Sequence, residues 1–483
     1  MKLNVIPKPL KVSFYGGETW VEESKITHSL NENYADEAYC LDIKSDGIVI
    51  TSKGEKGKFY ALKTLEQMSA MGKVPCCMIY DAPAFPYRGF MIDSARHMQT
   101  LDEIKMYIEA AARYKFNTFH WHLCDDQGWR IESEKYPLLM EKGAYRDCHG
   151  FGSSNMERYG GYYTKAEIKE IIDFCAERFI EVVPEIDMPG HTTAVVSTFP
   201  ELSCRGVQIP LETTGGIFKN ILCAGKEEVF EFCFNILDEV IELFPGRYIH
   251  IGGDEAPKAR WCNCSHCQKR IKDEGLENVE QLQGYFANRI IAFLEKKGKQ
   301  VLAWNESLNS GILNKNTIIC DWMDGAHKSE AFANEGGRII IEDFYHYYLD
   351  YPYGMTPLKK TYEYNPYLKK LNDTGKKGVM GVETPIWTEY IEDFEKMCYM
   401  CFPRMIAVAE RGWVRPENAD YCSFLIRLRN EREALEKIGI KMADESEWDP
   451  AFDIRFKNTW AHIKKNLTPA AIKATLMPNK NDD

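Results

Sequence analysis

From Arg88 onward, the sequence alternates between short apolar runs typical of buried strands and segments with helical periodicity. The helical segments are clearest at residues 104–111 and 168–175. A buried strand followed by a helix is the repeating unit of a parallel sheet. Such repetition predicts an α/β fold, a (β/α)8 TIM barrel. The apolar runs occupy residues 89–93, 118–123, 180–186, 248–252, 300–304, 317–322, 338–344 and 378–383.

Two of the helical segments carry recognisable start signals. Thr100 is followed by Glu103, and Thr164 is followed by Glu167. In this pattern the Thr hydroxyl accepts a backbone N–H from the first helical turn, and the Glu carboxylate accepts the backbone N–H of the Thr. We therefore expect a helix to begin directly after each of these threonines.

The sequence patterns divide the chain into three parts. Residues 1–84 contain β-like runs at 47–52 and 78–80 around a helical segment at 59–71, which predicts a small α+β domain. A turn-rich linker at 81–86 leads into the barrel, which we place at 85–415. Residues 416–483 hold a helical pattern at 421–438, which we expect to pack on the barrel, and end in a polar tail from Lys464.

Polar and aromatic residues follow nearly every predicted strand. A single Asp could cap the next helix, and a single Trp could belong to the core. Their recurrence after successive strands favours an active site, because the carboxyl ends of barrel strands meet at the face where such enzymes do chemistry. The residues are Asp93 and Arg96; Asp125, Asp126 and Trp129; Asp187 and His191; Asp254 and Glu255; Trp304 and Glu306; Trp322 and Asp324; Tyr348 and Asp350; Trp387 and Glu389.

The run at 247–255 is the most informative of these strand ends. Gly252 and Gly253 let the backbone turn out of the barrel, and Asp254 and Glu255 follow directly. Two adjacent carboxylates repel each other, so one of them keeps its proton to higher pH, as a general acid must. The alternative interpretation is a solvated acidic turn.

Composition excludes several classes of protein. The net charge of −12 opposes binding to nucleic acid. No apolar run approaches the ~18 residues of a membrane span. Pro7, Lys8 and Pro9 interrupt the region where a signal peptide would need an apolar core, so we expect a cytoplasmic protein.

The 16 cysteines are predicted to be reduced thiols, since most have apolar neighbours in the sequence. One cluster, Cys262, Cys264 and Cys267 with His266 between them, has a spacing that could hold zinc. No second Cys or His pair follows at a partnering distance. We therefore interpret the cluster as a surface loop with free thiols and assign no metal ligand, while a zinc-dependent regulator stays open as an alternative.

The remaining chemistry points to carbohydrate. Glycine-rich phosphate loops of the Walker or Rossmann type and a nucleophilic serine elbow are absent from the sequence, so we expect no cofactor. Carboxylates, tryptophans and one Arg remain at the strand ends. Tryptophan faces stack on pyranose rings, and carboxylates with Arg bind hydroxyls in pairs.

Six motifs then match a known family in order along the chain. They read GFMIDSARH at 89–97, HWHLCDDQGWR at 120–130, PEIDMPGH at 184–191, HIGGDE at 250–255, YLD at 348–350 and WTE at 387–389. With these motifs the chain resembles the family 20 glycoside hydrolases, the β-N-acetylhexosaminidases, from Ile6 to about Trp413. The resemblance implies substrate-assisted, retaining hydrolysis, in which the acetamido oxygen of the substrate attacks the anomeric carbon.

The resemblance also implies a role for each site residue. Glu255 would be the general acid and base, Asp254 would stabilise the oxazolinium ion, and Tyr348 would bind the acetamido oxygen. Sugar hydroxyls would be bound by Arg96, Asp350 and Glu389, and the sugar would be walled by Trp304, Trp322 and Trp387. Asp187 and His191 would orient the catalytic carboxylates. Where many members carry other residues, this chain has Glu383, which bears on the polarity of the pocket.

Several alternatives stay open at this point. The enzyme could prefer β-linked N-acetylgalactosamine, or it could release a disaccharide such as lacto-N-biose. A sugar-binding barrel without turnover is the non-enzymatic alternative. For partners we expect a carbohydrate with a β-linked N-acetylhexosamine, no nucleic acid and no membrane, and we allow for a homodimer.

Overall fold

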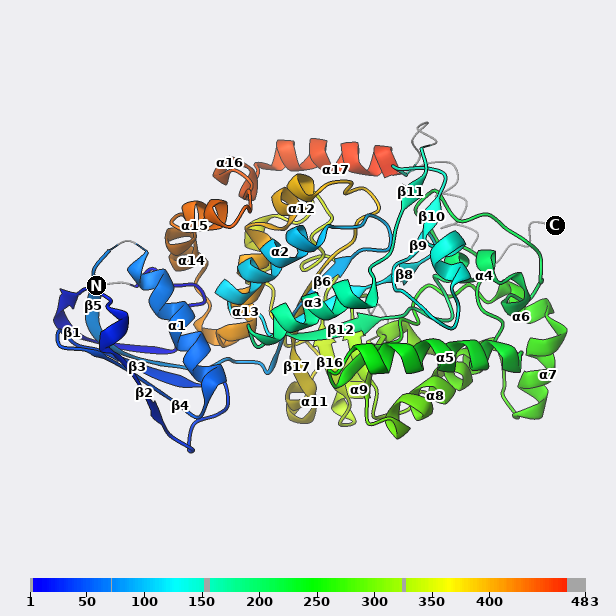
Figure 1. Ribbon diagram of the computed structural model, residues 1–483, viewed down its shortest axis with the longest axis horizontal. Helices are drawn as coiled ribbons and strands as arrows, with labels where there is room; N and C mark the ends of the chain where they lie inside the picture. The colour runs from blue at the N-terminus through cyan, green and yellow to red at the C-terminus, as the bar shows by residue number, and fades with distance from the viewer. Residues whose placement is uncertain (1–2, 71, 152–156, 324–326, 467–483) are drawn as a thin grey trace.

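Eight parallel strands close into a barrel. The structure is a computed structural model that describes residues 3–70, 72–151, 157–323 and 327–466. Each predicted strand is present, with its ends shifted by a few residues, and the predicted (β/α)8 fold is confirmed. The strands are β6 (Tyr87–Asp93), β7 (Thr118–His122), β12 (Glu181–Glu185), β13 (Tyr248–His250), β14 (Gln300–Trp304), β15 (Ile318–Asp321), β16 (Arg338–Ile341) and β17 (Val379–Ile386). Barrel strands such as β6, β12, β16 and β17 lie at the centre of the molecule in Figure 1.

The barrel closes where β17 pairs in parallel with β6, with Glu383 opposite Gly89. Both predicted capping boxes are formed, at the starts of α2 (Leu101–Arg113) and α3 (Lys165–Ala176). The other helices around the barrel include α5 (Glu227–Leu243), α8 (Val279–Lys296), α9 (Lys328–Asn334), α11 (Asp373–Gly378), α12 (Phe394–Cys401) and α13 (Arg404–Trp413).

One crossover departs from the repeating pattern. The structure describes every residue of the connection between β14 and β15. This connection forms only the 3-10 helix η4 (Asn305–Ser310). A connection this short has no room for the crossover helix that the repeat predicts. Loops at the carboxyl ends of the strands carry smaller elements: β8 (Cys124–Asp125), β9 (Gly128–Trp129), η2 (Leu139–Gly143), β10 (Tyr145–Arg146), β11 (Tyr159–Gly160), α4 (Thr193–Thr198), η3 (Pro200–Leu202), α6 (Ala259–Asn263), α7 (Ser265–Asp273) and α10 (Leu358–Glu363).

A five-stranded sheet with one helix forms the N-terminal part of the chain. The sheet has the order β1-β5-β3-β4-β2, and α1 packs on it. The sequence predicts β4 and β5 but not the other three strands. Strand β1 is almost wholly exposed, so it lacks the alternation of apolar residues that reveals a half-buried strand. The elements are β1 (Lys11–Thr19), η1 (Glu23–Lys25), β2 (Ile26–Leu30), β3 (Tyr39–Ile43), β4 (Ile48–Ser52), α1 (Glu55–Ser69) and β5 (Val74–Asp81).

The C-terminal segment is helical and packs on the barrel, but not as one helix. The predicted pattern at 421–438 is split into α14 (Tyr421–Leu428) and α15 (Arg432–Lys437). Between them the chain turns so that buried Glu431 accepts hydrogen bonds from Arg113 and Tyr114 of the barrel, at 2.8 and 2.9 Å. After η5 (Pro416–Asn418), α14, α15 and α16 (Glu445–Trp448), helix α17 (Phe452–Asn466) runs across the top of Figure 1.

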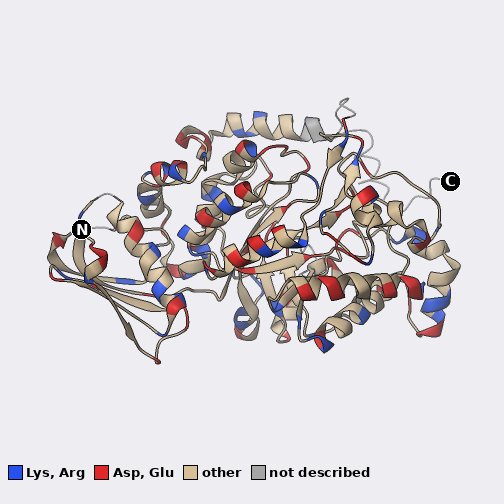
Figure 2. Ribbon diagram, viewed as in Figure 1, with Lys and Arg blue, Asp and Glu red and all other residues tan. Residues whose placement is uncertain are grey.

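The predicted domain boundaries at 84 and 415 stay predictions, and most of the polar tail from Lys464 lies outside the described residues. Figure 2 shows acidic residues interspersed with Lys and Arg along the outer helices. In the described part of the chain, none of the helices has both the length and the apolar character to cross a bilayer.

A buried ion pair joins the N-terminal sheet to the barrel. Lys115, in the loop after α2, lies 3.0 Å from Oδ2 of Asp81 at the end of β5, and both side chains are fully buried. The ammonium group also donates to the hydroxyl of Tyr39 at 2.9 Å and lies 4.3 Å from the ring centroid of Trp413. The indole of Trp413 in turn donates to Oδ1 of Asp81 at 2.9 Å.

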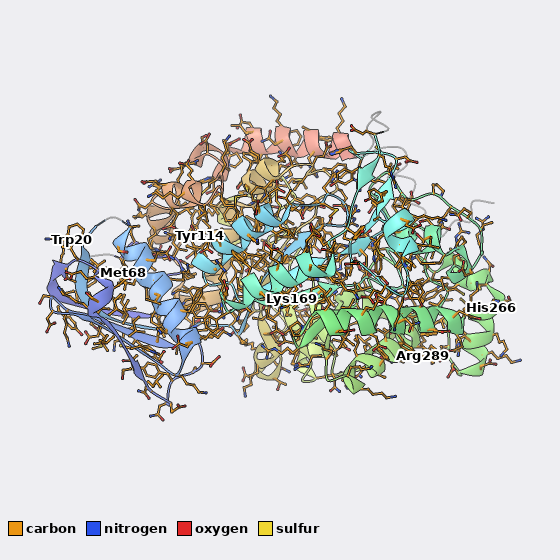
Figure 3. All side chains as sticks on the ribbon, viewed as in Figure 1. Trp20, Met68, Tyr114, Lys169, His266 and Arg289 are labelled. Atoms are coloured by element: carbon orange, nitrogen blue, oxygen red, sulfur yellow. The ribbon has the colours of Figure 1, made fainter. Side chains whose placement is uncertain are left out.

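We expect Lys115→Met to destabilise the protein strongly, because it leaves the carboxylate of Asp81 buried without its cation. Removing one partner of a buried pair costs about 3–5 kcal/mol of unfolding free energy. Denaturant unfolding measures the change. The matched control is Lys169→Met on α3 (Figure 3), whose ion pair with Asp173 is exposed. That variant should lose about 0.5 kcal/mol or less, and equal losses in the two variants would contradict the assigned role of the buried pair.

Candidate active site

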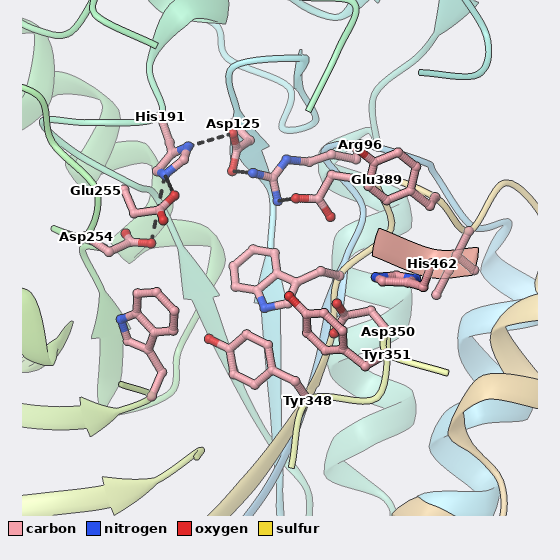
Figure 4. Close-up of a pocket in the computed structure, with 14 residues that line it drawn as sticks. Arg96, Asp125, His191, Asp254, Glu255, Tyr348, Asp350, Tyr351, Glu389 and His462 are labelled. Atoms are coloured by element: carbon pink, nitrogen blue, oxygen red, sulfur yellow. Dashed lines mark hydrogen bonds and ion pairs between the residues drawn. The ribbon is translucent and has the colours of Figure 1, made fainter. Parts of the chain in front are cut away.

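A cleft with a cavity volume of about 190 Å3 opens at the carboxyl ends of the barrel strands, and Figure 4 shows its side chains. Most of the predicted site residues meet there, although they follow strands that are far apart in the sequence. The predicted residues that line the cleft are Arg96, His191, Asp254, Glu255, Trp322, Tyr348, Asp350, Trp387 and Glu389. Asp324, another strand-end residue, lies outside the described residues.

The turn after β13 presents two carboxyl groups to the cleft. Gly252 and Gly253 have φ angles of 65° and 99°, and Glu255 has a φ of 40° although it carries a side chain. A Cβ on Gly252 would lie 1.7 Å from Oδ1 of Asp187, and the same oxygen accepts the N–H of Gly253 at 3.1 Å. Asp187 therefore lies beneath the turn and holds it. Left-handed backbone at a residue other than glycine is strained, and such strain concentrates at functional sites.

Asp254 is the more buried of the two carboxyl groups. Its side chain is 12% exposed, against 32% for Glu255. Burial raises the pKa of Asp254 well above its ordinary value, and the negative charges of Asp187 and Glu255 raise it further. Among the described residues, its buried Oδ1 has no hydrogen-bond partner. Since buried polar atoms are nearly always paired, this oxygen is free to accept a hydrogen bond from a ligand.

His191 bridges the two carboxyl groups to a second acidic pair. Its Nε2 lies 3.5 Å from Oε2 of Glu255 and 3.9 Å from Oδ2 of Asp254. Its Nδ1 lies 3.1 Å from Oδ1 of Asp125 and 3.0 Å from Oδ2 of Asp126. Burial alone would lower the pKa of His191, but Asp125 and the other acidic neighbours outweigh burial and raise it well above its ordinary value. The imidazole is therefore a cation at neutral pH.

Arg96 holds the opposite side of the cleft. Its guanidinium lies 2.7 Å from Oδ2 of Asp125, 3.2 Å from Oδ2 of Asp93 and 3.5 Å from Oε1 of Glu389. It also lies 5.1 Å from the ring centroid of Trp387. A guanidinium fixed in this way offers paired donors in a set plane, which suits adjacent hydroxyl groups.

Two further carboxyl groups lie on this side of the cleft. Burial raises the pKa of Asp350 well above its ordinary value, and Glu389 adds to the effect. Burial also raises the pKa of Glu389, although the nearby Arg96 opposes the shift. Carboxyl groups that hold a proton can donate as well as accept hydrogen bonds.

Aromatic side chains form one wall of the cleft. The rings of Trp322 and Tyr348 are 6.1 Å apart at an angle of 24°, and Tyr348 and Trp387 are 6.2 Å apart. Trp304 lies behind this wall, fully buried, with its ring 6.1 Å from Trp387. Its indole N–H donates to Oε1 of Glu185 at 2.8 Å. Trp304 therefore supports the wall and does not face the cleft.

The cleft includes residues to which the sequence analysis assigned no role: Asp125, Tyr351, Tyr390, Ile391 and His462. Asp125 follows a predicted strand, so a signal for it exists. His462 has none, because it reaches the cleft from α17, where its ring packs 5.4 Å from that of Tyr351. The position of α17 depends on how the C-terminal segment crosses the barrel, which local sequence does not specify.

Beneath the cleft, buried histidines and glutamates fill the barrel interior. His120 lies 2.6 Å from Oε1 of Glu383 and 3.1 Å from Oε2 of Glu185, and His250 lies 3.0 Å from Oε1 of Glu185. The hydroxyl of Tyr87 donates to Oε2 of Glu383 at 2.6 Å. Glu383, expected from the resemblance to affect the polarity of the pocket, therefore belongs to this interior network and does not line the cleft.

His122 connects the interior network to the cleft. Its Nδ1 contacts Oε2 of Glu185, and its Nε2 lies 2.8 Å from Oδ2 of Asp125. Burial by itself would lower the pKa of His122, but its contacts with Glu185 and Asp125 outweigh burial and raise the pKa to about 9. The side chains of Asp125, Asp187 and His191 come close enough together to share a cation. The hydrogen bonds and ion pairs described above already engage these groups.

The cysteine cluster differs from the prediction. Cys262 and His266 are exposed, and Figure 3 places His266 at the outer edge of the molecule. Cys264 and Cys267 are instead buried. Their partners are Cys204 and Cys223, which lie too far away in the sequence for the local spacing to reveal them. The interpretation of a surface loop is therefore wrong for Cys264 and Cys267, whose side chains are buried.

Comparisons with protein families and with individual proteins point to the same family. Residues 85–416 match the sequence model of the glycosyl hydrolase family 20 catalytic domain, and residues 18–82 match that of the family's domain 2. A β-hexosaminidase of Porphyromonas gingivalis is 37% identical over 84% of this chain, and one of Akkermansia muciniphila is 33% identical over 86%. The chain spans 54% of the length of the first relative and 87% of the second.

A solved structure is similar as well. The GH20 exo-β-N-acetylglucosaminidase from Vibrio harveyi, in complex with N-acetylglucosamine, superposes with a TM-score of 0.81 at 29% sequence identity. The match covers 92% of this chain and 79% of the other.

We expect the unfolding free energy to fall as the pH rises from about 6.5 to about 9, because His122 loses its proton there. In the folded protein its pKa is raised, so its contribution is complete below the unfolded pKa of about 6.5 and is lost as the pH passes the folded value of about 9. The full loss amounts to roughly 3 kcal/mol. Urea unfolding across this pH range measures it.

The control is His122→Asn, whose amide does not titrate. This variant will be less stable throughout, so the slopes are compared and not the absolute values. Its profile should be flatter than that of the parent protein between pH 6.5 and 9. Identical slopes would show that His122 is not the titrating group.

Proposed function

This chain belongs to glycosyl hydrolase family 20, and on that basis we propose that it is an exo-acting β-N-acetylhexosaminidase. The proposed reaction removes terminal, non-reducing β-linked N-acetylglucosamine or N-acetylgalactosamine from oligosaccharides or glycoconjugates. It proceeds by substrate-assisted retaining catalysis through an oxazolinium intermediate, the route that distinguishes this family from glycosidases with a carboxylate nucleophile.

The observation that carries this proposal is the buried Oδ1 of Asp254, which has no hydrogen-bond partner in the described part of the chain, beside the more exposed Glu255. An acetamido N–H is a suitable donor for this oxygen. Accepting that N–H turns the acetamido oxygen toward the anomeric carbon, and the phenol of Tyr348 in the aromatic wall supports this oxygen. Ionised Asp254 then stabilises the positive charge that develops on the oxazolinium ring.

Glu255 supplies the proton chemistry. In the first step the acetamido oxygen bonds to C1, the bond from C1 to the leaving oxygen breaks, and the Glu255 carboxyl gives its proton to that oxygen. In the second step the Glu255 carboxylate takes a proton from water, water oxygen bonds to C1, and the oxazolinium ring reopens. The configuration at C1 is retained because it is inverted twice.

The cation of His191 supports both steps. Its Nε2 lies 3.5 Å from Oε2 of Glu255, so it stabilises the carboxylate that remains after the proton leaves. Asp125 and Asp126 hold the other nitrogen, which fixes the ring in this position. His191 is therefore a positioning residue, and so is Asp187 beneath the glycine turn.

Buried charged groups at the far side of the cleft support exo-action. In this proposal Arg96, Asp350 and Glu389 bind the hydroxyls of one terminal sugar while its face lies on Trp387. The solved Vibrio harveyi relative is a complex with N-acetylglucosamine, which supports a monosaccharide of this type as the product. The preference between the two N-acetylhexosamines, the cytoplasmic location and the homodimer stay predictions.

The decisive experiment compares the protein with Glu255→Gln on paired chromogenic β-GlcNAc and β-GalNAc glycosides and on an unactivated disaccharide. We expect the variant to lose about 10²–10⁴-fold in kcat on the disaccharide, because the amide cannot donate a proton to the leaving oxygen. The loss in the first step should be smaller with an activated phenol, which leaves without protonation. Turnover by the parent protein should be inhibited by an acetamido-mimicking thiazoline.

The possible results separate the alternatives. Parent-like turnover by Glu255→Gln would contradict its role as the acid. An absence of turnover on both glycosides would favour a disaccharide-releasing enzyme or a sugar-binding barrel. Thiazoline binding without turnover would favour the binding protein.

Asp254→Asn tests substrate assistance separately. We expect kcat on N-acetylated substrates to fall by about 10²–10³-fold, because the neutral amide cannot stabilise the oxazolinium cation. The matched comparison is the corresponding β-glucoside, whose 2-hydroxyl cannot form this intermediate. The variant should not gain activity on this glucoside. Equal kcat/KM for glucoside and N-acetylglucosaminide in the parent protein would rule the mechanism out.

A further inference from the structure

Four cysteine sulfurs converge away from the cleft. Sγ of Cys223 lies 3.5 Å from that of Cys267 and 3.7 Å from that of Cys264, and Cys204 Sγ lies 3.8 Å from Cys267 Sγ. All four sulfurs lie within 4.8 Å of one another. Cys223, Cys264 and Cys267 are buried and Cys204 is half-buried. We call these four residues the cysteine cluster.

The spacing of the sulfurs fits a tetrahedral metal centre better than it fits disulfides. A disulfide joins sulfurs at about 2.05 Å, far shorter than these contacts. Zinc binds thiolates at about 2.3 Å, and four ligands at the corners of a tetrahedron of that radius lie about 3.8 Å apart. The three sulfur–sulfur separations given above, from 3.5 to 3.8 Å, lie close to this value.

The backbone around the cluster has two features that are common at metal-binding cysteines: a helix N-terminus and an N–H group that donates to a sulfur. Cys264 occupies the N-cap of α7 and Cys267 lies in its first turn. Thiolates are stabilised at a helix N-terminus by its free amides. The N–H of Gly225 donates to the sulfur of Cys223, two residues earlier. Hydrogen bonds of this kind orient the ligands of a metal and lower the charge on them.

Two chain segments meet closely enough at the cluster that only glycine fits between them. A Cβ on Gly225 would lie 2.2 Å from the backbone carbon of His266. Lys226 donates to the carbonyl of Ser203 at 2.8 Å, and Arg270 lies 3.4 Å from the carbonyl of Gly225. These cations lie next to the cluster, where they would offset the negative charge of four thiolates.

We propose that Cys204, Cys223, Cys264 and Cys267 bind one structural zinc ion per chain. Four thiolates favour zinc because it is a borderline-soft cation that accepts a tetrahedral sulfur shell without redox chemistry. All four positions are filled by protein, so the site leaves no open position for water or substrate. The ion is a structural one.

The zinc site would restrain the active-site loops through hydrogen bonds made by the residue next to Cys223. Leu222, next to Cys223, donates its N–H to the carbonyl of Pro189 at 3.1 Å, in the loop that carries His191. The carbonyl of Leu222 accepts the indole N–H of Trp261, at 2.9 Å, on the helix that follows Glu255. One ion would therefore tie together the loop that positions His191 and the segment that leaves the catalytic turn.

The test is metal analysis of the intact protein, purified without chelator from cells supplied with zinc. We expect about one zinc per chain, and a zinc K-edge absorption spectrum that fits four sulfurs at about 2.3 Å. Neither measurement depends on the folding of a variant. A protein that contains no zinc, or a spectrum dominated by nitrogen and oxygen ligands, would overturn the proposal.

Variants identify the ligands. Cys267→Ser should weaken zinc binding by about tenfold or more in a competition assay with a chromogenic chelator, because the shell loses one thiolate. Cys262→Ser, on the same segment but exposed, is the matched control and should keep the parent zinc content. Equal zinc loss in both variants, or a disulfide between cluster residues in the freshly purified protein, would contradict the assignment.

Discussion

The carboxylate of Asp125 makes the ion pairs on which the geometry of the site depends. It lies 2.7 Å from Arg96, 3.1 Å from His191 and 2.8 Å from His122. Burial by itself would raise the pKa of Asp125, but these cationic neighbours outweigh burial and lower it well below its ordinary value. One anion therefore joins Arg96 on one side of the cleft, His191 on the other side and His122 in the barrel interior. Because a buried anion requires its cations close by, the three elements hold a fixed geometry.

The buried carboxyl groups of the cleft suit the substrate proposed above. Asp254, Asp350 and Glu389 have raised pKa values because burial penalises their charged forms. In the proposed reaction, a bound sugar would supply hydroxyl and amide hydrogens to these groups, and the oxazolinium ring would supply a positive charge beside Asp254. The ionised form of Asp254 would then be favoured most when the cation develops, which is the condition for stabilising the transition state more than the ground state.

The catalytic turn is held from two directions. From inside, Asp187 lies beneath Gly252 and accepts the N–H of Gly253, which keeps the strained backbone of Glu255 in place. From outside, the loops around the cysteine cluster reach the carbonyl of Pro189 and the indole of Trp261. A metal in the cluster would add to this restraint without touching the substrate. Precise placement matters here because proton transfer depends on distances of a few tenths of an ångström.

The sequence by itself determined the barrel and most of the candidate site. Buried strands such as Gln300–Trp304 are read from short apolar runs, and both capping boxes are local patterns. The carboxyl ends of parallel strands must meet, so the sequence predicts that strand-end residues such as Asp254, Tyr348 and Arg96 lie close together.

Only the tertiary structure decided which side chains face the cleft and which support it. Trp304 and Asp187 lie behind the site, and Glu383 belongs to the barrel interior, because the direction of a side chain depends on strand tilt and packing. His462 enters from a C-terminal helix, and Cys204 and Cys223 join Cys264 and Cys267 across a long loop. Contacts between distant segments leave no local pattern, since they arise when the chain closes on itself and not from the spacing of neighbouring residues.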